Sequence, residues 1–393
     1  MKSKPRIKYI AIIIVNIIII ASICILAVVG KSMAVSQQYN SAAERWQNGS
    51  KEHFSQVSTF LSEDAGFTTD KLNSVRAEFI KSLRDASIET EDENLPFSDA
   101  YSSQMGTFTI RGDLTGRSDA VLTVTGGDFF SFRNFILING SFFTDNDLMQ
   151  DGAVIDRNLA WELYGSYDVA GMNLYIDGVK FYISGVIENP ATAPENDCIG
   201  KLPRIYISYD GASNLSTVST GNNVENIDGE TSGKASASDP TTIIPMSSGF
   251  KRITCYETVL PNPVKNFAYN TVNKQFSENY KDKYTIVKNS TRFDPSVRAK
   301  AFKKISDYAV IKNNINYPYW ENASRLIEFR LTFLYFFRRV LFAVPVLTLV
   351  WLAILGVKFL RKKQPAVLRA ISIFIDRRRR DIKEILKNKK KKV

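Results

Sequence analysis

Two long apolar segments near the ends of the chain constrain its fold more than any other feature. Residues 9–29 contain Asn16 as their only strongly polar residue, and residues 340–357 contain no charged residue. A helix of about 20 apolar residues spans the roughly 30 Å hydrocarbon core of a bilayer. The sequence therefore predicts a two-pass membrane protein that displays the segment 31–330 between its spans.

The basic residues gather beside these two apolar segments. Residues 1–8 carry four Lys or Arg and no acid, and residues 361–393 carry fourteen Lys or Arg against three acids. Since the whole chain has a net charge of +11, the part between the two tails is net acidic. Lys and Arg are enriched on the cytoplasmic flanks of membrane spans. We therefore expect both termini in the cytoplasm, and charge placed next to spans argues against nucleic-acid binding.

Hydropathy and charge together divide the chain into five parts. Residues 1–8 form a basic cytoplasmic N-terminus, 9–30 the first membrane helix and 31–330 an extracytoplasmic domain. Residues 331–360 combine an interfacial segment with the second membrane helix, and 361–393 form a basic amphipathic cytoplasmic tail. The long first apolar run, with no A-x-A site after it, favours an uncleaved anchor over a signal peptide.

Short strands interleaved with helices predict an α+β fold for the extracytoplasmic domain, which is large enough for two lobes. Residues 31–68 are interpreted as a helical stalk. Residues 210–250, rich in Ser, Thr, Asn and Gly, are interpreted as a flexible insertion. A helix over 70–85, with Thr69 as N-cap, would bury Leu72, Val75, Phe79 and Leu83 on one face. Strands are also predicted at 104–111, 120–125, 174–176, 179–186, 204–208 and 283–287, and helices at 158–164, 267–276 and 298–310. After the insertion, regular structure is expected to resume at 251–259.

Residues 126–190 carry an ordered series of short motifs rich in glycine and aromatic residues. In chain order they are Asp128-Phe129-Phe130, Gly140 with Phe142 and Phe143, Asp147, Ala153-Val154-Ile155, Leu159-Ala160, Leu163-Tyr164-Gly165, Asp168-Val169 with Gly171, Asp177-Gly178 and Ile183-Ser184-Gly185-Val186. A further strand, 203–207, follows. In order and spacing these motifs resemble the periplasmic core domain of MacB/FtsX-type ABC transporter permeases.

The resemblance implies a MacB-like core between membrane helices, with ATP hydrolysis supplied by a partner. The chain departs from the family in having Gly140-Ser141 where the family has Gly-Arg. It also shows two predicted spans where the usual permease has four. We therefore expect a reduced, two-span form that depends on a separate ABC ATPase, a full permease, or both, as a homo- or hetero-oligomer.

The sequence offers little material for catalysis. His53 is the only histidine, and neither a G-x-S-x-G motif nor a P-loop occurs, so no catalytic residue and no cofactor site is predicted. Asp145, Asp147 and Asp151 faintly resemble a calcium loop, but Gln150 stands where an EF-hand needs Gly. No metal site is predicted, and the chain is interpreted as a non-enzyme.

Two residue sets remain as candidate sites. Cys198 and Cys255 both fall in the domain where disulfides are permitted, and the sequence leaves open whether they are bonded or are separate thiols. In the tail, apolar residues at helical spacing accompany Arg377, Arg378, Arg379 and Arg380. This pattern predicts contact with anionic lipid, or with a cytoplasmic ATPase.

Three functions compete. The first is a non-enzymatic membrane subunit of an ABC-type transport or mechanotransmission complex. In it, the external domain engages substrate or envelope partners and the spans couple to a separate ATPase or permease. The second is a two-span sensor with an external ligand-binding domain. The third is a regulator of polysaccharide chain length, which the strand-rich segment 104–210 disfavours.

Overall fold

The computed structural model describes residues 4–47, 53–88, 96–188, 192–221, 250–308 and 313–390. By its internal contacts the chain divides into two compact units. One is the domain, Gly30–Phe333. The other, the helical unit, combines Met1–Val29 with Leu334–Val393.

The helical unit consists of most of α1 (Lys4–Val35) and most of α11 (Tyr319–Lys390). Each contains a stretch long and apolar enough to cross a membrane. These are Tyr9–Val35, with a mean hydropathy of 3.3, and Tyr319–Phe359, with a mean hydropathy of 2.6. The predicted spans 9–30 and 331–360 lie inside these two helices, and α11 continues through the basic tail to Lys390.

A ten-stranded sheet organises the domain. All of its neighbouring pairs are antiparallel except β3 with β8 and β5 with β7. In spatial order the sheet contains β10 (Tyr284–Lys288), β1 (Phe54–Leu61), β9 (Cys255–Pro261), β2 (Ser98–Gly112), β3 (Arg117–Gly127), β8 (Arg204–Ser208), β5 (Gly152–Asp156), β7 (Val179–Ile187) and β4 (Leu137–Gly140), while β6 (Asn173–Ile176) pairs with both β2 and β7.

The double pairing of β6 closes part of the sheet on itself. Strands β2, β3, β8, β5, β7 and β6 form a closed circuit, and β9, β1 and β10 extend the sheet from β2. A closed part and an extended part of the domain share this one sheet, and Gly30–Phe333 forms one compact unit.

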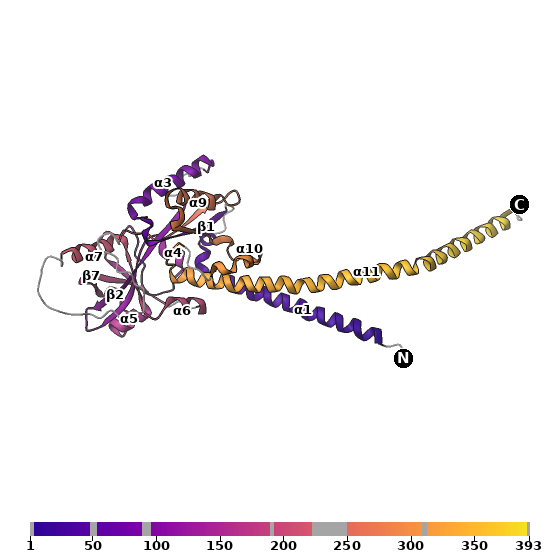
Figure 1. The fold of residues 1–393 in the computed structure, drawn as a ribbon, viewed down its shortest axis with the longest axis horizontal. Helices are drawn as coiled ribbons and strands as arrows, with labels where there is room; N and C mark the ends of the chain where they lie inside the picture. Colours follow the sequence, from indigo (N-terminus) through magenta and orange to yellow (C-terminus); the bar gives the residue numbers. More distant parts are fainter. Residues whose placement is uncertain are drawn as a thin grey trace. The chain divides into compact units, whose positions relative to one another are not determined.

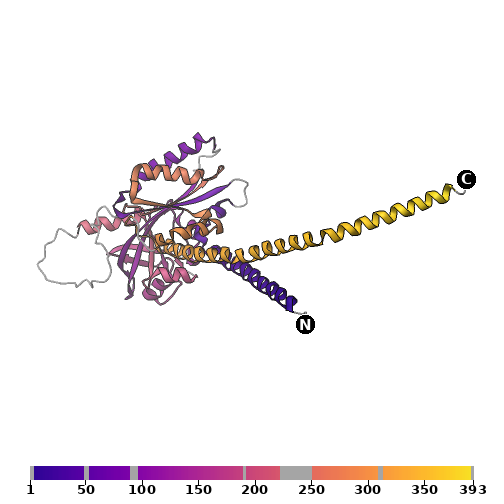
Figure 2. The ribbon, with the colours of Figure 1, turned by 45° about the vertical axis from the view of Figure 1, so that its right-hand side comes forward.

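Helices cover both parts of the sheet. Over the extended part, α3 (Thr69–Asp85) and α9 (Phe267–Tyr280) lie side by side (Figures 1 and 2). The closed part is covered by α5 (Arg157–Tyr164) and α7 (Tyr209–Gly221). Shorter helices are η1 (Gln38–Asn40), α2 (Ala42–Gln47), η2 (Glu63–Ala65), α4 (Phe129–Arg133), α6 (Ala193–Ile199), η4 (Lys281–Lys283), η5 (Asn289–Thr291), α10 (Pro295–Ala301) and η6 (Phe302–Tyr308).

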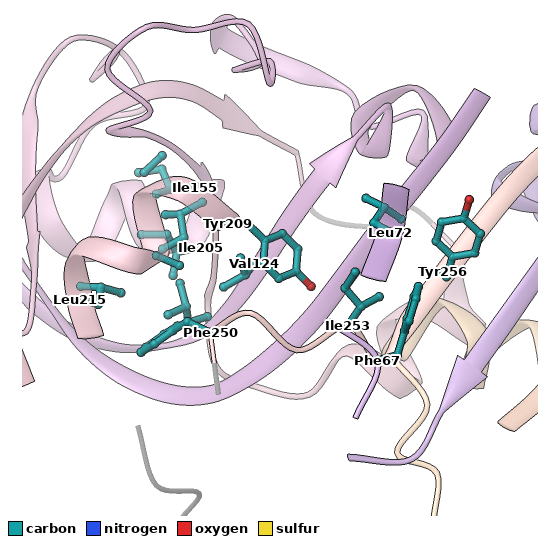
Figure 3. Packing of buried hydrophobic residues seen from close by; sticks show 14 of the residues in the cluster. Phe67, Leu72, Val124, Ile155, Ile205, Tyr209, Leu215, Phe250, Ile253 and Tyr256 are labelled. Carbon is teal, nitrogen blue, oxygen red and sulfur yellow. The ribbon is translucent and has the colours of Figure 1, made fainter. Parts of the chain in front are cut away.

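One hydrophobic cluster runs beneath these helices. Figure 3 shows Tyr209 and Phe250 close to the aliphatic side chains of the closed part, and Phe67 next to Tyr256 in the extended part. The predicted face of α3, made of Leu72, Val75, Phe79 and Leu83, is fully buried in this cluster. Burial of that face, with its helical spacing, is what fixes α3 against the sheet.

Most predicted elements are present within a few residues of the expected bounds. The Asp177-Gly178 turn joins β6 to β7, and the strand predicted at 204–208 is β8. The N-cap of α3 is Thr68 rather than Thr69.

The helical stalk predicted for 31–68 is wrong from Phe54 onward, and residues 48–52 of it lie outside the described part. α1 ends at Val35, and residues Phe54–Leu61 form β1, which lies between β10 and β9. Seven of the eight β1 residues are buried, including its serines, glutamine and threonine, because the strand has neighbours on both edges and packing on both faces. Because β1 is rich in polar residues, its sequence did not predict a buried strand inside the sheet.

The insertion predicted for 210–250 begins as a helix instead, since α7 covers Tyr209–Gly221. Residues 222–249 lie outside the described part. The helix predicted at 298–310 is α10 followed by the 3-10 helix η6, which ends at Tyr308, and the last two predicted residues are also outside the described part.

Candidate functional site

A buried arginine lies where the chain leaves the domain for α11. Arg292 follows η5, and its side chain is 2% exposed. Its Nη1 and Nη2 donate to the two carboxylate oxygens of Glu321, over 2.8 and 3.0 Å. Its Nε donates to Glu328 over 3.2 Å. A planar guanidinium suits this forked arrangement, which fixes direction as well as charge.

A second arginine completes the charge balance. Arg298 of α10 places Nη1 3.1 Å from Glu328 Oε1, and α10 lies beside the start of α11 (Figures 1 and 2). Burial alone would lower the pKa of Arg292, but Glu321 and Glu328 outweigh burial and hold that pKa above its ordinary value. Two cations and two carboxylates therefore neutralise one another inside the domain.

The segment that follows α1 joins the same network. Asn40 Oδ1 accepts from Arg292 Nη1 and from Asn289 Nδ2, both over 2.8 Å. Asn40 Nδ2 donates to Ser324 Oγ over 2.8 Å. Ser324 in turn lies 3.4 Å from Gln37 Oε1. We call this set the charged joint: Gln37, Asn40, Asn289, Arg292, Arg298, Glu321, Ser324 and Glu328.

Two aromatic residues fasten the first turn of α11 to the sheet. Arg133 is buried, pairs with Glu257 of β9 and lies 4.1 Å from the ring centroid of Trp320. Burial, against weaker opposing charges, lowers the pKa of Arg133 to about 10. Arg204 of β8 lies 4.5 Å from the ring centroid of Tyr319. Desolvated cation–π contacts of this kind are worth about 2 kcal/mol each.

The arrangement is built for rigidity. Within the described residues, no three His, Cys, Asp or Glu side chains are grouped to hold a metal ion. Each buried charge of the joint contacts an opposite charge. The joint connects residues 37–40, just after α1, with the first turns of α11.

Cys198 and Cys255, whose pairing the sequence left open, are both free thiols in the structure. Cys198 lies on α6 and is partly exposed, whereas Cys255 begins the central strand β9 and is 2% exposed. Burial raises the pKa of the Cys255 thiol to about 12. Both cysteines serve as packing residues of the second hydrophobic cluster, the one that also contains Trp320.

The other predicted sites are the tail arginines and the aspartates of the suspected calcium loop. Arg377, Arg378 and Arg380 are exposed on α11, and the side chain of Arg379 lies outside the described part. Two carboxylates of the suspected calcium loop accept hydrogen bonds from the protein itself. Asp145 accepts from the N–H of Gly127 over 2.8 Å, and Asp147 accepts from the N–H and hydroxyl of Thr144.

Sequence reasoning missed the charged joint. One signal was present, since Glu321 and Glu328 are seven residues apart on one helix face just before an apolar run. No sequence pattern near Arg292 or Asn40 indicated that these residues bind Glu321, Ser324 and Glu328.

An α+β domain flanked by two helices that are apolar enough to cross a membrane defines a class of membrane protein with a large displayed domain. Residues 10–241 match the family model of the MacB-like periplasmic core domain, which is more than half of the chain. The chain belongs to this family, and the resemblance to MacB/FtsX-type ABC transporter permeases is confirmed.

Solved structures show weaker likenesses. The extracellular domain of the noncanonic ABC-type transporter YknZ from Gram-positive bacteria is 14% identical, with a TM-score of 0.36, over 59% of this chain and 99% of that one. The periplasmic region of MacB from Actinobacillus actinomycetemcomitans is 14% identical, with a TM-score of 0.35, over 60% and 90%. A domain of a putative permease from Porphyromonas gingivalis is 14% identical, with a TM-score of 0.32, over 60% and 89%. None of the curated proteins matches. The family assignment rests on residues 10–241.

Proposed function

We propose that the chain is a non-enzymatic membrane subunit of an ABC-type transport or mechanotransmission complex. Its domain, outside the cytoplasm, engages a substrate or an envelope partner. Its two membrane helices couple that engagement to a separate ATPase or permease. Family membership supports the class of complex, and the basic flanks of both spans support cytoplasmic termini.

The charged joint is the observation that carries the coupling role. Asn40 and Arg292 bind residues after α1 to Glu321, Ser324 and Glu328 of α11. Breaking a buried ion pair by removing one partner costs about 3–5 kcal/mol, so the joint resists being pulled apart. A displacement of the domain is then passed to both segments together.

Co-purification tests the proposal. The tagged full chain is purified in mild detergent from its native cell after crosslinking, and a nucleotide-binding subunit is expected with it. Recovery of a homo-oligomer alone, without ATPase or permease, would contradict the proposal.

A tail variant identifies what the cytoplasmic arginines contact. Arg377, Arg378, Arg379 and Arg380 are changed together to Gln, with exposed Arg117 of β3 changed to Gln as the matched control. If the tail holds the ATPase, the quadruple variant loses co-purification and the control does not. If the tail binds anionic lipid, the variant keeps its ATPase and loses affinity for phosphatidylglycerol vesicles.

A further inference from the structure

The sheet ends at a strand with a groove beside it. Within the described residues β10 pairs only with β1. A cavity of about 470 Å³ is lined by residues 285–288 of β10, together with residues of α10 and α11. Because side chains of a strand alternate between two faces, a groove on one face would meet every second residue. Four consecutive lining residues place this groove along the edge of the strand.

Hydrogen bonds show which backbone groups face that edge. Leu61, opposite Tyr284, donates its N–H to Thr254 over 2.8 Å, on the side away from β10. Opposed residues of an antiparallel pair exchange both bonds or neither, so the backbone groups of Tyr284 point away from β1. Accordingly, Asn313 Nδ2 donates to the carbonyl oxygen of Tyr284 over 3.2 Å.

The same alternation extends along the strand. Ile286 and Lys288 share the orientation of Tyr284, so their N–H and C=O groups face the groove. The C=O of Lys288 is the N-cap carbonyl of η5, which accepts the first bond of that 3-10 helix. For the N–H and C=O of Ile286 and the N–H of Lys288, the part of the chain that the structure describes supplies no hydrogen-bond partner. The groove therefore offers alternating donors and acceptors at the spacing of a peptide backbone.

The walls of the groove carry excess positive charge. Arg292 and Arg298 line it, but both are paired with carboxylates of the charged joint. Lys288 donates to the neutral Asn266 over 2.6 Å, and Arg325 lies 4.3 Å from the ring centroid of Tyr317. Among the described residues, neither Lys288 nor Arg325 forms a salt bridge, so two cations remain for a ligand.

We propose that the β10 edge binds an extended acidic segment of a partner protein, which adds to the sheet as a further strand. Main-chain hydrogen bonds to Ile286 and Lys288 supply the pairing, and carboxylates of the segment meet Lys288 and Arg325. A phosphate or lipid headgroup would satisfy the cations and the N–H groups but leave the outward carbonyl of Ile286 unused. This inference rests on the proposed function and specifies the partner that the domain engages.

The variant Ile286→Pro tests the outward edge of β10 without disturbing its pairing with β1. The N–H of Ile286 points away from β1, so proline removes the outward donor and keeps the β1–β10 hydrogen bonds. Ile286→Val retains the donor and is the matched control. Lys288→Gln/Arg325→Gln removes the charges and keeps the backbone.

The test uses the full chain in detergent and a fluorescein-labelled ten-residue peptide of alternating Val and Thr with two Glu. Fluorescence anisotropy should show saturable binding to wild type and to Ile286→Val, and no binding to Ile286→Pro. The double charge variant should bind about tenfold more weakly, as two exposed ion pairs would give. A peptide with Lys in place of Glu, and one with a central Pro, should both bind at least about tenfold more weakly.

Three outcomes would overturn the proposal. The first is no binding of the acidic peptide to wild type. The second is unchanged binding by Ile286→Pro or equal binding of the proline peptide, which would indicate a site that recognises charge alone, as for phosphate or lipid. The third is a peptide-free dimer that Ile286→Pro converts to a monomer, which would make the edge a self-interface. Each is independent of ATPase co-purification, so the proposed function can survive when this inference fails.

Discussion

Arg292 contributes bonds to Asn40, Glu321 and Glu328, so single substitutions there test the charged joint at the scale of one residue. Arg292→Met leaves two buried carboxylates without their main partner, and we expect a loss of about 3–5 kcal/mol in the free energy of unfolding. Urea denaturation followed by tryptophan fluorescence measures this loss. Arg117→Met, on an exposed position, should stay within about 0.5 kcal/mol of wild type. Equal stability of the two variants would show that the joint does not hold the domain.

Asp156 gives the domain a pH dependence with a defined sign. Its Oδ1 caps α5 by accepting from the N–H of Leu159, and its Oδ2 accepts from the N–H of Arg204. Burial raises the pKa of Asp156 to about 6, against these hydrogen bonds, which lower it. The folded state therefore binds a proton more readily than the unfolded state. Stability from this group is present at low pH and is lost as pH rises from about 4 to about 6.

The comparison with Asp156→Asn isolates this effect. Between about pH 4.5 and pH 7, wild type should lose about 2 kcal/mol of unfolding free energy that the variant keeps. Asn still caps the helix through its one oxygen, loses the bond from the N–H of Arg204 at every pH, and cannot ionise. Denaturation midpoints at the two pH values measure the difference, and parallel pH profiles would rule out a raised pKa at this site.

At the scale of elements, the sequence predicted those helices and turns whose formation depends on residues close together in the chain. The face of α3 and the Asp177-Gly178 hairpin were readable because helical spacing and a two-residue turn are short-range signals. Strand β1 was not predicted, because its polar side chains form hydrogen bonds with residues outside the strand. Gln56 accepts from the N–H of Ala42 and donates to the carbonyl of Tyr39, and Ser58 donates to Glu257.

The charged joint could not be predicted from the sequence for the same reason, because its residues lie far apart in the chain. Asn40 and Ser324 are bonded across 284 residues. A single sequence gives the charge of Glu321 and Glu328, but the pairing of Arg292 with both depends on how η5 packs against α11. The two long apolar helices and the family motifs were predictable from the sequence, whereas the long-range polar contacts were not.

The two helices of the helical unit meet through polar side chains. Thr348 Oγ1 donates to Asn16 Oδ1 over 2.9 Å, and Asn16 Nδ2 donates to Ile12 O of its own helix. Such bonds between membrane helices average about 0.6 kcal/mol, so their main effect is on register. We expect Asn16→Cys/Thr348→Cys, in a Cys24→Ala background, to form a disulfide rapidly in oxidised membranes. Asn16→Cys/Leu347→Cys, with position 347 exposed on α11, should crosslink much more slowly. Equal rates would contradict this register.

At the scale of the whole molecule, the edge groove and the charged joint share residues. Arg292, Arg298 and Glu328 line the groove and also belong to the joint. A strand that binds at β10 would therefore press on side chains that connect the segments after α1 and at the start of α11. The contacts that bind a partner and the contacts that couple the domain to the spans would then share the same side chains.

That mechanism requires the domain and the basic tail to lie on opposite sides of a membrane. In a background without native cysteines, Lys180→Cys, exposed on β7, should react with an impermeant maleimide in intact cells. Arg377→Cys, exposed on α11, should react only after lysis, because Lys- and Arg-rich flanks remain in the cytoplasm. Labelling is read by gel shift with both variants expressed equally. Reaction of Arg377→Cys in intact cells would place the tail outside and remove the route to a cytoplasmic ATPase.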